Sequence, residues 1–148
     1  MRQKAMRGAT SKVLLALASA VSLCVAAGPA AAAPCFRYTE RLTLSGKLVV
    51  KTYPGIPNYE SVAQGDAPET VLVLLLPKPI CMEANKADTS VLDEAVSGVR
   101  AVQLAATRKE LGVTPGRAVR VSGNVFAAHT GHHHTPLVMS EVRVEEAR

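Results

Sequence analysis

The pattern of apolar positions predicts five β-strands between residues 41 and 144. Residues 41–51 alternate between apolar and polar side chains, as do residues 118–126, which is typical of strands with one buried face. Residues 71–76 are apolar throughout, which indicates a strand covered on both faces. Two further strands are expected over 99–104 and 137–144. The positions expected to face the core in the alternating strands are Leu42, Leu44, Leu48, Val50, Val119, Val121, Gly123 and Val125.

The segments between these strands carry turn and helix signals. Residues 52–69 contain three prolines and two glycines, which predicts one long loop. Residues 105–111 are helix formers followed by Gly112, which predicts one short helix between strands three and four. Gly46, inside the first strand, indicates a bulge or a sharp bend. Residues 34–40 are assigned to an irregular lead-in.

Three strands, a short helix and two more strands follow the element order of an OB-fold, a small five-stranded Greek-key barrel. The expected fold class is therefore mainly β, with residues 34–148 as a single OB-like domain. Small β-sandwiches have similar patterns, so they remain an alternative. OB-folds bind ligands with the loop between strands one and two and the loop between strands four and five. Here these are residues 53–69 and 128–136, which would face each other across one mouth.

Residues 1–33 have the organisation of a secretory signal peptide. A basic stretch, an apolar run and a stretch of small residues follow one another in that order. Cleavage after Ala32 or after Ala33 fits the small-residue rule. Cys24 admits a lipid anchor as an alternative, although Leu23 before it is bulky for lipidation. We therefore expect a periplasmic or secreted chain with no membrane span once the leader is removed.

Removal of this leader changes the charge of the protein. The whole chain has a formal net charge of +5, but four of its 17 basic residues lie in the leader and all 12 acidic residues follow it. The mature chain would therefore carry about +1, which does not favour a phosphate-binding surface. Only 3% of the residues are aromatic. With the export signal, these features disfavour nucleic acid as a partner.

Two of the three cysteines, Cys35 and Cys81, remain after the leader is removed. A single pair in a small exported domain is expected to form a disulfide. Closing a loop of this length would stabilise the fold by about 4 kcal/mol on the chain-entropy model. The alternative is a pair of buried free thiols.

All four histidines lie within residues 129–134. In an extended segment His132 and His134 point to the same face, and a turn at Gly131 would bring His129 back towards them. Three imidazole nitrogens could hold a divalent metal such as zinc and leave a fourth position for water. Two alternatives remain. One is a plain turn with one buried, hydrogen-bonded imidazole, and the other is a cluster that gains charge together in acid.

Three stretches carry a resemblance to a known family. They are PGIPNYESVAQGD at residues 54–66, PIC at 79–81 and AHTGHHHT at 128–135. Through them essentially the whole mature chain resembles a secreted bacterial family, domain of unknown function 4431. The resemblance implies a small exported domain, alone or attached to other envelope modules, and it implies no activity.

The sequence contains no motif of serine hydrolases, zinc metalloproteases, P-loop proteins or dinucleotide-binding proteins. We therefore expect a non-catalytic module that binds a small molecule or an envelope protein through the two loops. The alternative is a divalent-metal protein or a metal-dependent hydrolase that uses the histidine cluster. The candidate ligand-binding residues are Tyr53, Tyr59, Glu60, Asp66, His129 and Thr130, and the candidate metal ligands are His129, His132 and His134.

Overall fold

The computed structural model describes residues 33–86 and 94–146 of the chain. These residues belong to one compact unit, Ala31–Arg148. The predicted leader lies outside the described residues, apart from Ala33. Residues 87–93 lie outside them as well; the sequence predicts a polar loop over 83–89 and a short helical turn or irregular segment over 90–97.

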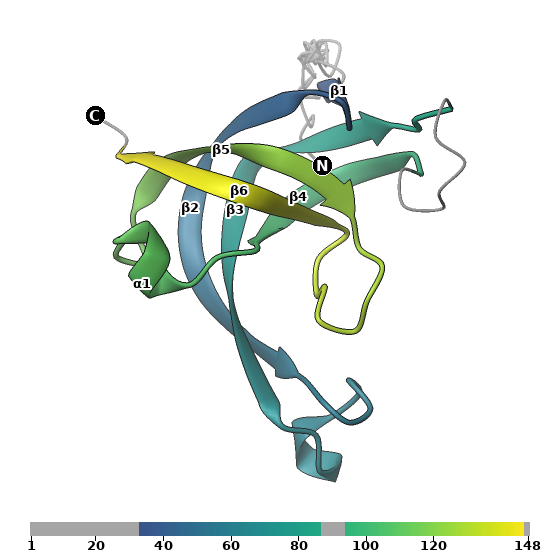
Figure 1. Cartoon of the computed structure of the whole chain (residues 1–148), viewed down its shortest axis with the longest axis vertical. Coiled ribbons are helices and arrows are strands. Elements are labelled where there is room, and N and C mark those ends of the chain that lie inside the picture. The colour runs from purple at the N-terminus through teal and green to yellow at the C-terminus, as the bar shows by residue number, and fades with distance from the viewer. Residues whose placement is uncertain (1–32, 87–93, 147–148) are drawn as a thin grey trace, which may run out of the picture. The chain divides into compact units, whose positions relative to one another are not determined.

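The described part of the chain is mainly β, as the apolar pattern predicts (Figure 1). Its strands belong to one six-stranded sheet, and one short α-helix lies between β4 and β5. None of the helical segments described is long and apolar enough to cross a membrane. In chain order the elements are β1 (Cys35–Arg37), β2 (Arg41–Pro54), a 3-10 turn (Val62–Gln64), β3 (Pro68–Glu83), β4 (Val96–Leu104), α1 (Arg108–Leu111), β5 (Ala118–Ala127) and β6 (Leu137–Glu146).

The strand pairings run in a closed circuit through five of the six strands. β2, β3 and β4 form an antiparallel meander, and β4 pairs with β6 in parallel. β6 then pairs with β5, and β5 pairs with β2, both antiparallel. Each of these five strands therefore has a neighbour on both sides. β1 is added outside the circuit, parallel to β3.

The prediction of five strands is wrong by one. The sequence pattern assigns residues 35–37 to a lead-in, whereas they form β1, with Cys35 opposite Cys81 and Phe36 opposite Met82. Phe36 is partly buried and packs against the core. A strand of three residues is too short for alternation to reveal, and its partner is distant in the sequence.

β3 continues well beyond the apolar run of residues 71–76. The sequence pattern makes Pro77 and Pro79 the end of this strand, but β3 passes through both. Pairing with β2 ends at Leu75, and the register with β4 shifts between Leu75 and Ile80. Proline has no N–H to donate, so it is tolerated where ladder pairing is interrupted.

β2 changes partner at its middle. Its first half pairs with β5 and its second half with β3, and Lys47 pairs with both Ala118 and Leu75. A Cβ added to Gly46 would overlap the carbonyl oxygen of Leu75, so this close backbone approach requires glycine. Beyond this point β2 and β3 continue as an arm, residues 50–72, which extends past the other strands (Figure 1). Outside the pair of Leu72 with Leu104 the arm is two-stranded.

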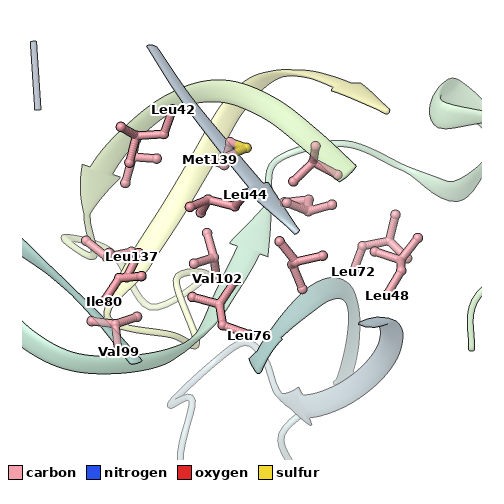
Figure 2. Close-up of a cluster of buried hydrophobic side chains, with 14 of the residues drawn as sticks. Leu42, Leu44, Leu48, Leu72, Leu76, Ile80, Val99, Val102, Leu137 and Met139 are labelled. Carbon is pink, nitrogen blue, oxygen red and sulfur yellow. The ribbon is translucent and has the colours of Figure 1, made fainter. Parts of the chain in front are cut away.

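Apolar side chains from the five strands of the circuit gather in one buried cluster (Figure 2). Val50 was expected among them but is 38% exposed, because β2 has entered the arm at that position. The other positions predicted from alternation are buried, namely Leu42, Leu44, Leu48, Val119, Val121, Gly123 and Val125.

α1 is shorter than the predicted helix over 105–111. Thr107 caps its N-terminus, and a capping box with Glu110 makes Arg108 the first helical residue. Gly112 ends the helix with φ 62°, in the left-handed region that glycine adopts without strain. The predicted stop is therefore confirmed, while the predicted start is three residues early.

Cys35 and Cys81 form the predicted disulfide. Their Cα atoms are 4.4 Å apart, although the residues are separated by 46 positions in the sequence. The bond attaches the short β1 to the edge of β3. A disulfide fits a location outside the cytoplasm.

Removal of this disulfide should destabilise the fold. In the Cys35→Ser/Cys81→Ser variant the free energy of unfolding should fall by about 4 kcal/mol, because the unfolded chain is no longer constrained. Urea unfolding followed by circular dichroism measures the change. Dithiothreitol should lower the stability of the wild type to a similar level and leave the double variant unchanged. Equal stability of the oxidised wild type and the variant would contradict this account.

Candidate functional site

Two loops that are far apart in the sequence meet in the structure. The β2–β3 loop (residues 55–67) lies at the end of the arm, and the histidine loop (residues 128–136) connects β5 to β6. The contacts between the two segments involve Tyr53, Tyr59 and Glu69 on the arm side and Gly131, His132 and His134 on the other.

Asp66 holds the β2–β3 loop in shape from inside. Its carboxylate accepts hydrogen bonds from the backbone N–H groups of Asn58 at 2.9 Å, Glu60 at 2.7 Å and Ser61 at 2.8 Å. Hydrogen bonds from Ser61 and Asn58 are the main cause that lowers the pKa of Asp66, against a smaller opposing effect of burial. The ionised carboxylate therefore fixes the loop backbone.

This loop places Tyr59 against the histidine loop. Tyr59 has φ 61°, in the left-handed region, which costs a non-glycine residue about 1–2 kcal/mol. Its ring lies on Gly131, where an added Cβ would approach three ring carbons to 2.6–2.8 Å. Glycine at this position therefore makes room for the tyrosine ring.

His132 joins the two loops through both of its ring nitrogens. Nδ1 lies 2.9 and 3.0 Å from the carboxylate oxygens of Glu69, and Nε2 lies 2.9 Å from the hydroxyl of Tyr59. An ionised carboxylate can only accept, so Nδ1 carries a proton and donates it. In the neutral ring Nε2 then accepts from the tyrosine hydroxyl. The three groups form a hydroxyl–imidazole–carboxylate chain.

His134 approaches the same carboxylate from a buried position. Its side chain is 8% exposed, and Nε2 lies 3.3 Å from Oε2 of Glu69. Its ring stacks on that of Tyr53, with centroids 4.5 Å apart and planes 7° apart. The contact to Glu69 is within ion-pair range but is not aligned as a hydrogen bond. Among the described residues, this Nε2 is the buried side-chain atom left without a hydrogen bond.

The surroundings of Glu69 keep its carboxylate ionised. Burial raises the pKa of this carboxyl. The hydrogen bond from His132 and the charges of His132 and His134 lower it, and their combined effect is larger, so the pKa lies below the ordinary value of 4.5. The side chain is still 26% exposed. A ligand in solvent can therefore reach an anionic oxygen at this position.

A buried glutamine on β4 fixes the backbone of the histidine loop. The side-chain amide of Gln103 donates to the carbonyl of His132 and accepts from the N–H of His134, both at 2.8 Å. The backbone N–H of Gln103 donates to the hydroxyl of Thr135, which itself donates to the carbonyl of Leu137. These bonds tie the segment that presents His132 and His134 to the sheet.

The other two histidines form a separate group within the histidine loop. Nδ1 of His133 accepts from the backbone N–H of His129 at 3.1 Å, and Nδ1 of His129 lies 3.0 Å from the carbonyl of Ala127. Both rings contact Phe126. Burial, followed by the charges of the other histidines, lowers the pKa of His133. This pair stabilises the loop rather than reaching the arm.

The structure thus divides the predicted site residues. Tyr53, Tyr59, His132 and His134 come together around Glu69, whereas His129 pairs with His133. Asp66 uses its carboxylate within its own loop, where Glu60 contributes a backbone N–H, and the carbonyl of Thr130 accepts from His133. No three His, Cys, Asp or Glu side chains within residues 33–86 and 94–146 are arranged to hold a metal ion.

Sequence reasoning missed Glu69 and Gln103. Glu69 pairs with Tyr53 across the arm, and cross-strand partners share a face. Extending the first two predicted strands towards each other would have pointed to this residue. Gln103 lies between Val102 and Leu104 in β4, but Ser97 and Arg100 are polar residues of the same strand, so polarity alone did not mark Gln103 as a buried residue.

An open pocket of about 310 Å³ adjoins the contact between the loops. Glu69 and His132 form its polar part, and Ile56, which is 59% exposed, provides an apolar side chain. Its other lining residues are Gly55, Ala67, Pro68 and Thr70.

Comparison with known proteins finds a family model that matches part of the chain. Residues 101–145 match a family model whose description is Domain of unknown function (DUF4431). The match spans the end of β4, α1, β5, the histidine loop and most of β6. Neither the curated proteins nor the solved structures contain a match to this chain.

Substitution of Gln103 should release the histidine loop. Gln103→Ala leaves the part-buried carbonyl of His132 and N–H of His134 without their partner, so the free energy of unfolding should fall by about 1–3 kcal/mol. Gln103→Glu is the matched control, because it keeps the acceptor for His134 but loses the donor to His132. Denaturant unfolding and amide hydrogen exchange over residues 128–136 measure the effect. Unchanged exchange in the alanine variant would contradict the proposed role.

The contacts of Glu69 should make stability depend on pH. The pKa of Glu69 is lowered in the folded state. Its contribution to the free energy of unfolding is therefore present above about pH 4.5 and is lost as the pH falls through the pKa of the folded state. Glu69→Gln should therefore be less stable than the wild type at pH 7, and this difference should shrink near pH 3. Glu83→Gln, which removes an exposed carboxylate, is the control. A difference that does not change with pH would count against the account.

Proposed function

We propose that this chain is an exported, non-catalytic binding module of OB-like type, with its ligand site between residues 53–69 and 128–136. The OB-like assignment is supported by the circuit of pairings β2–β3–β4–β6–β5, with the parallel pair β4–β6 and the helix before β5. The leader pattern and the disulfide support export to the periplasm or beyond the cell.

The observation that carries the proposal is the meeting of the two loops beside an open pocket. Glu69 supplies an ionised oxygen to this pocket, and His132 supplies one edge of a fixed imidazole. Ile56 is exposed next to them without any apolar neighbour that buries it. Small-molecule sites combine an apolar lining with a few convergent polar groups in this way. The ligand favoured by these groups is a small molecule with a cationic or donor head and a short apolar tail.

The hydroxyl–imidazole–carboxylate chain does not by itself indicate a hydrolase. It has the order of a nucleophilic triad, which requires the hydroxyl to face the substrate. Tyr59 is not among the residues that line the pocket, and its hydroxyl bonds to His132 while its ring packs on Gly131. These contacts favour a role in holding the loops together.

A divalent-metal protein is the second candidate. The observation that favours it is the buried Nε2 of His134, which lies without a hydrogen bond 3.3 Å from Oε2 of Glu69. Nδ1 of His132 lies 2.9 Å from the same oxygen. A metal such as zinc would have to separate these groups and use Glu69 in place of His129. In the arrangement described, the groups contact each other directly.

Binding of butylammonium, with butyrate as the charge-reversed probe, tests the proposal. Butylammonium should shift the NMR signals of Ile56, Glu69 and His132, and butyrate should not. Glu69→Gln should raise the dissociation constant for butylammonium about tenfold, because one charged hydrogen bond is lost. Glu83→Gln is the matched control and should bind normally.

Metal analysis of untagged mature protein, recovered from the periplasm of an expression host, separates the two candidates. About one equivalent of a single metal, lost in His132→Ala/His134→Ala and absent from wild type treated with chelator, would favour the metal protein. Equal binding of butylammonium by the wild type and Glu69→Gln would overturn the ligand site.

A further inference from the structure

A second and larger pocket lies at the root of the arm, beside α1. It has a volume of about 510 Å³, and its walls come from two parts of the chain. One wall is Val50 of β2 with residues 70–72 of β3, and the other is residues 104–110, from the end of β4 into α1. We call this pocket the α1 groove. It shares only Thr70 with the pocket at the two loops.

The face of the arm that supplies Val50 is opposite to the face that supplies Tyr53. Side chains alternate along a strand, so residues at odd and even positions of β2 point to opposite sides. Val50 pairs with Leu72, whereas Tyr53 pairs with Glu69. The arm therefore presents an apolar pair towards α1 and a polar pair towards the histidine loop.

The floor of the α1 groove is apolar and incompletely covered. Leu72 and Leu104 are buried beneath it, while Val50 is 38% exposed. Val50 is one of three large apolar side chains exposed in the described part of the chain. Ala105 and Ala106 follow β4 at this point, and their small side chains leave the volume open.

The rim of the α1 groove is cationic. Arg108 and Lys109 line it and are exposed, and within residues 33–86 and 94–146 neither forms an ion pair. Glu110 also lines the groove, and its carboxylate accepts from the backbone N–H of Thr107 at 2.6 Å. Two cations and one anion therefore leave the rim beside the apolar hollow with a net charge of +1.

We propose that the α1 groove binds a single-chain anionic amphiphile, with its alkyl chain on Val50 and Leu72 and its headgroup at Arg108 and Lys109. The volume falls within the range of small-molecule pockets, and the apolar lining with a few charges at one end matches such ligands. The groove lies between two walls, which suits one alkyl chain in solution rather than the flat surface of a bilayer. This site is independent of the one proposed at the two loops.

Calorimetric titration with decanoate and with decyltrimethylammonium, each below its micelle concentration, tests the proposal on the mature protein. Decanoate should bind, and the cationic probe should bind at least about tenfold more weakly. NMR signals of Val50, Leu72 and Ala105 should shift with decanoate, while those of residues 128–136 should not.

Three variants and one control locate the site. Arg108→Gln/Lys109→Gln should weaken decanoate binding about tenfold, whereas Lys47→Gln/Lys78→Gln, which removes two exposed lysines elsewhere, should not. Val50→Asp should abolish binding. Ala105→Met should also abolish decanoate binding, because its side chain fills the groove without adding charge. This variant replaces Val50→Asp in the test if Val50→Asp fails to fold.

Equal affinity for the two probes, or normal binding by the Arg108/Lys109 variant, would overturn the proposal. Binding only to vesicles of anionic lipid, with none to monomeric decanoate, would also overturn it and would point to a membrane surface instead. Shifts confined to residues 128–136 would assign the amphiphile to the other pocket.

Discussion

The change of partner in β2 determines much of the remaining structure. A strand that stayed beside β5 along its whole length would end within the sheet, with no arm beyond it. The close approach at Gly46 lets β2 leave β5 and continue with β3 alone. The arm created in this way carries Tyr53 and Glu69 on one face and Val50 on the other. Both proposed sites therefore depend on one glycine-dependent backbone contact.

The arm would be poorly supported by its own pairing, because a two-stranded ribbon is only marginally stable in water. Its contacts with the histidine loop supply the missing support. His132 bonds to Tyr59 and Glu69, and His134 stacks on Tyr53. The left-handed backbone of Tyr59 is a local cost offset by these contacts. Ligand binding beside them would act on groups whose positions are already fixed.

Gln103 connects the core of the sheet to the histidine loop by hydrogen bonds. A buried amide that satisfies both a carbonyl and an N–H of the histidine loop fixes that loop relative to β4. The same β4 then continues into the segment that forms the α1 groove. One strand therefore positions a wall of one site and the backbone of the other.

The sequence by itself determined the mainly β class, most core positions of the two alternating strands, the helix stop at Gly112 and the Cys35–Cys81 pair. These follow from short-range alternation, glycine conformation and the count of cysteines, which are local or compositional properties. Tertiary structure alone decided that β1 pairs with β3, that β3 passes Pro77, and that the four histidines divide into two pairs. Glu69 contacts His132 and His134, which are more than sixty residues away in the sequence. A local sequence pattern cannot indicate which residues so far apart will be in contact.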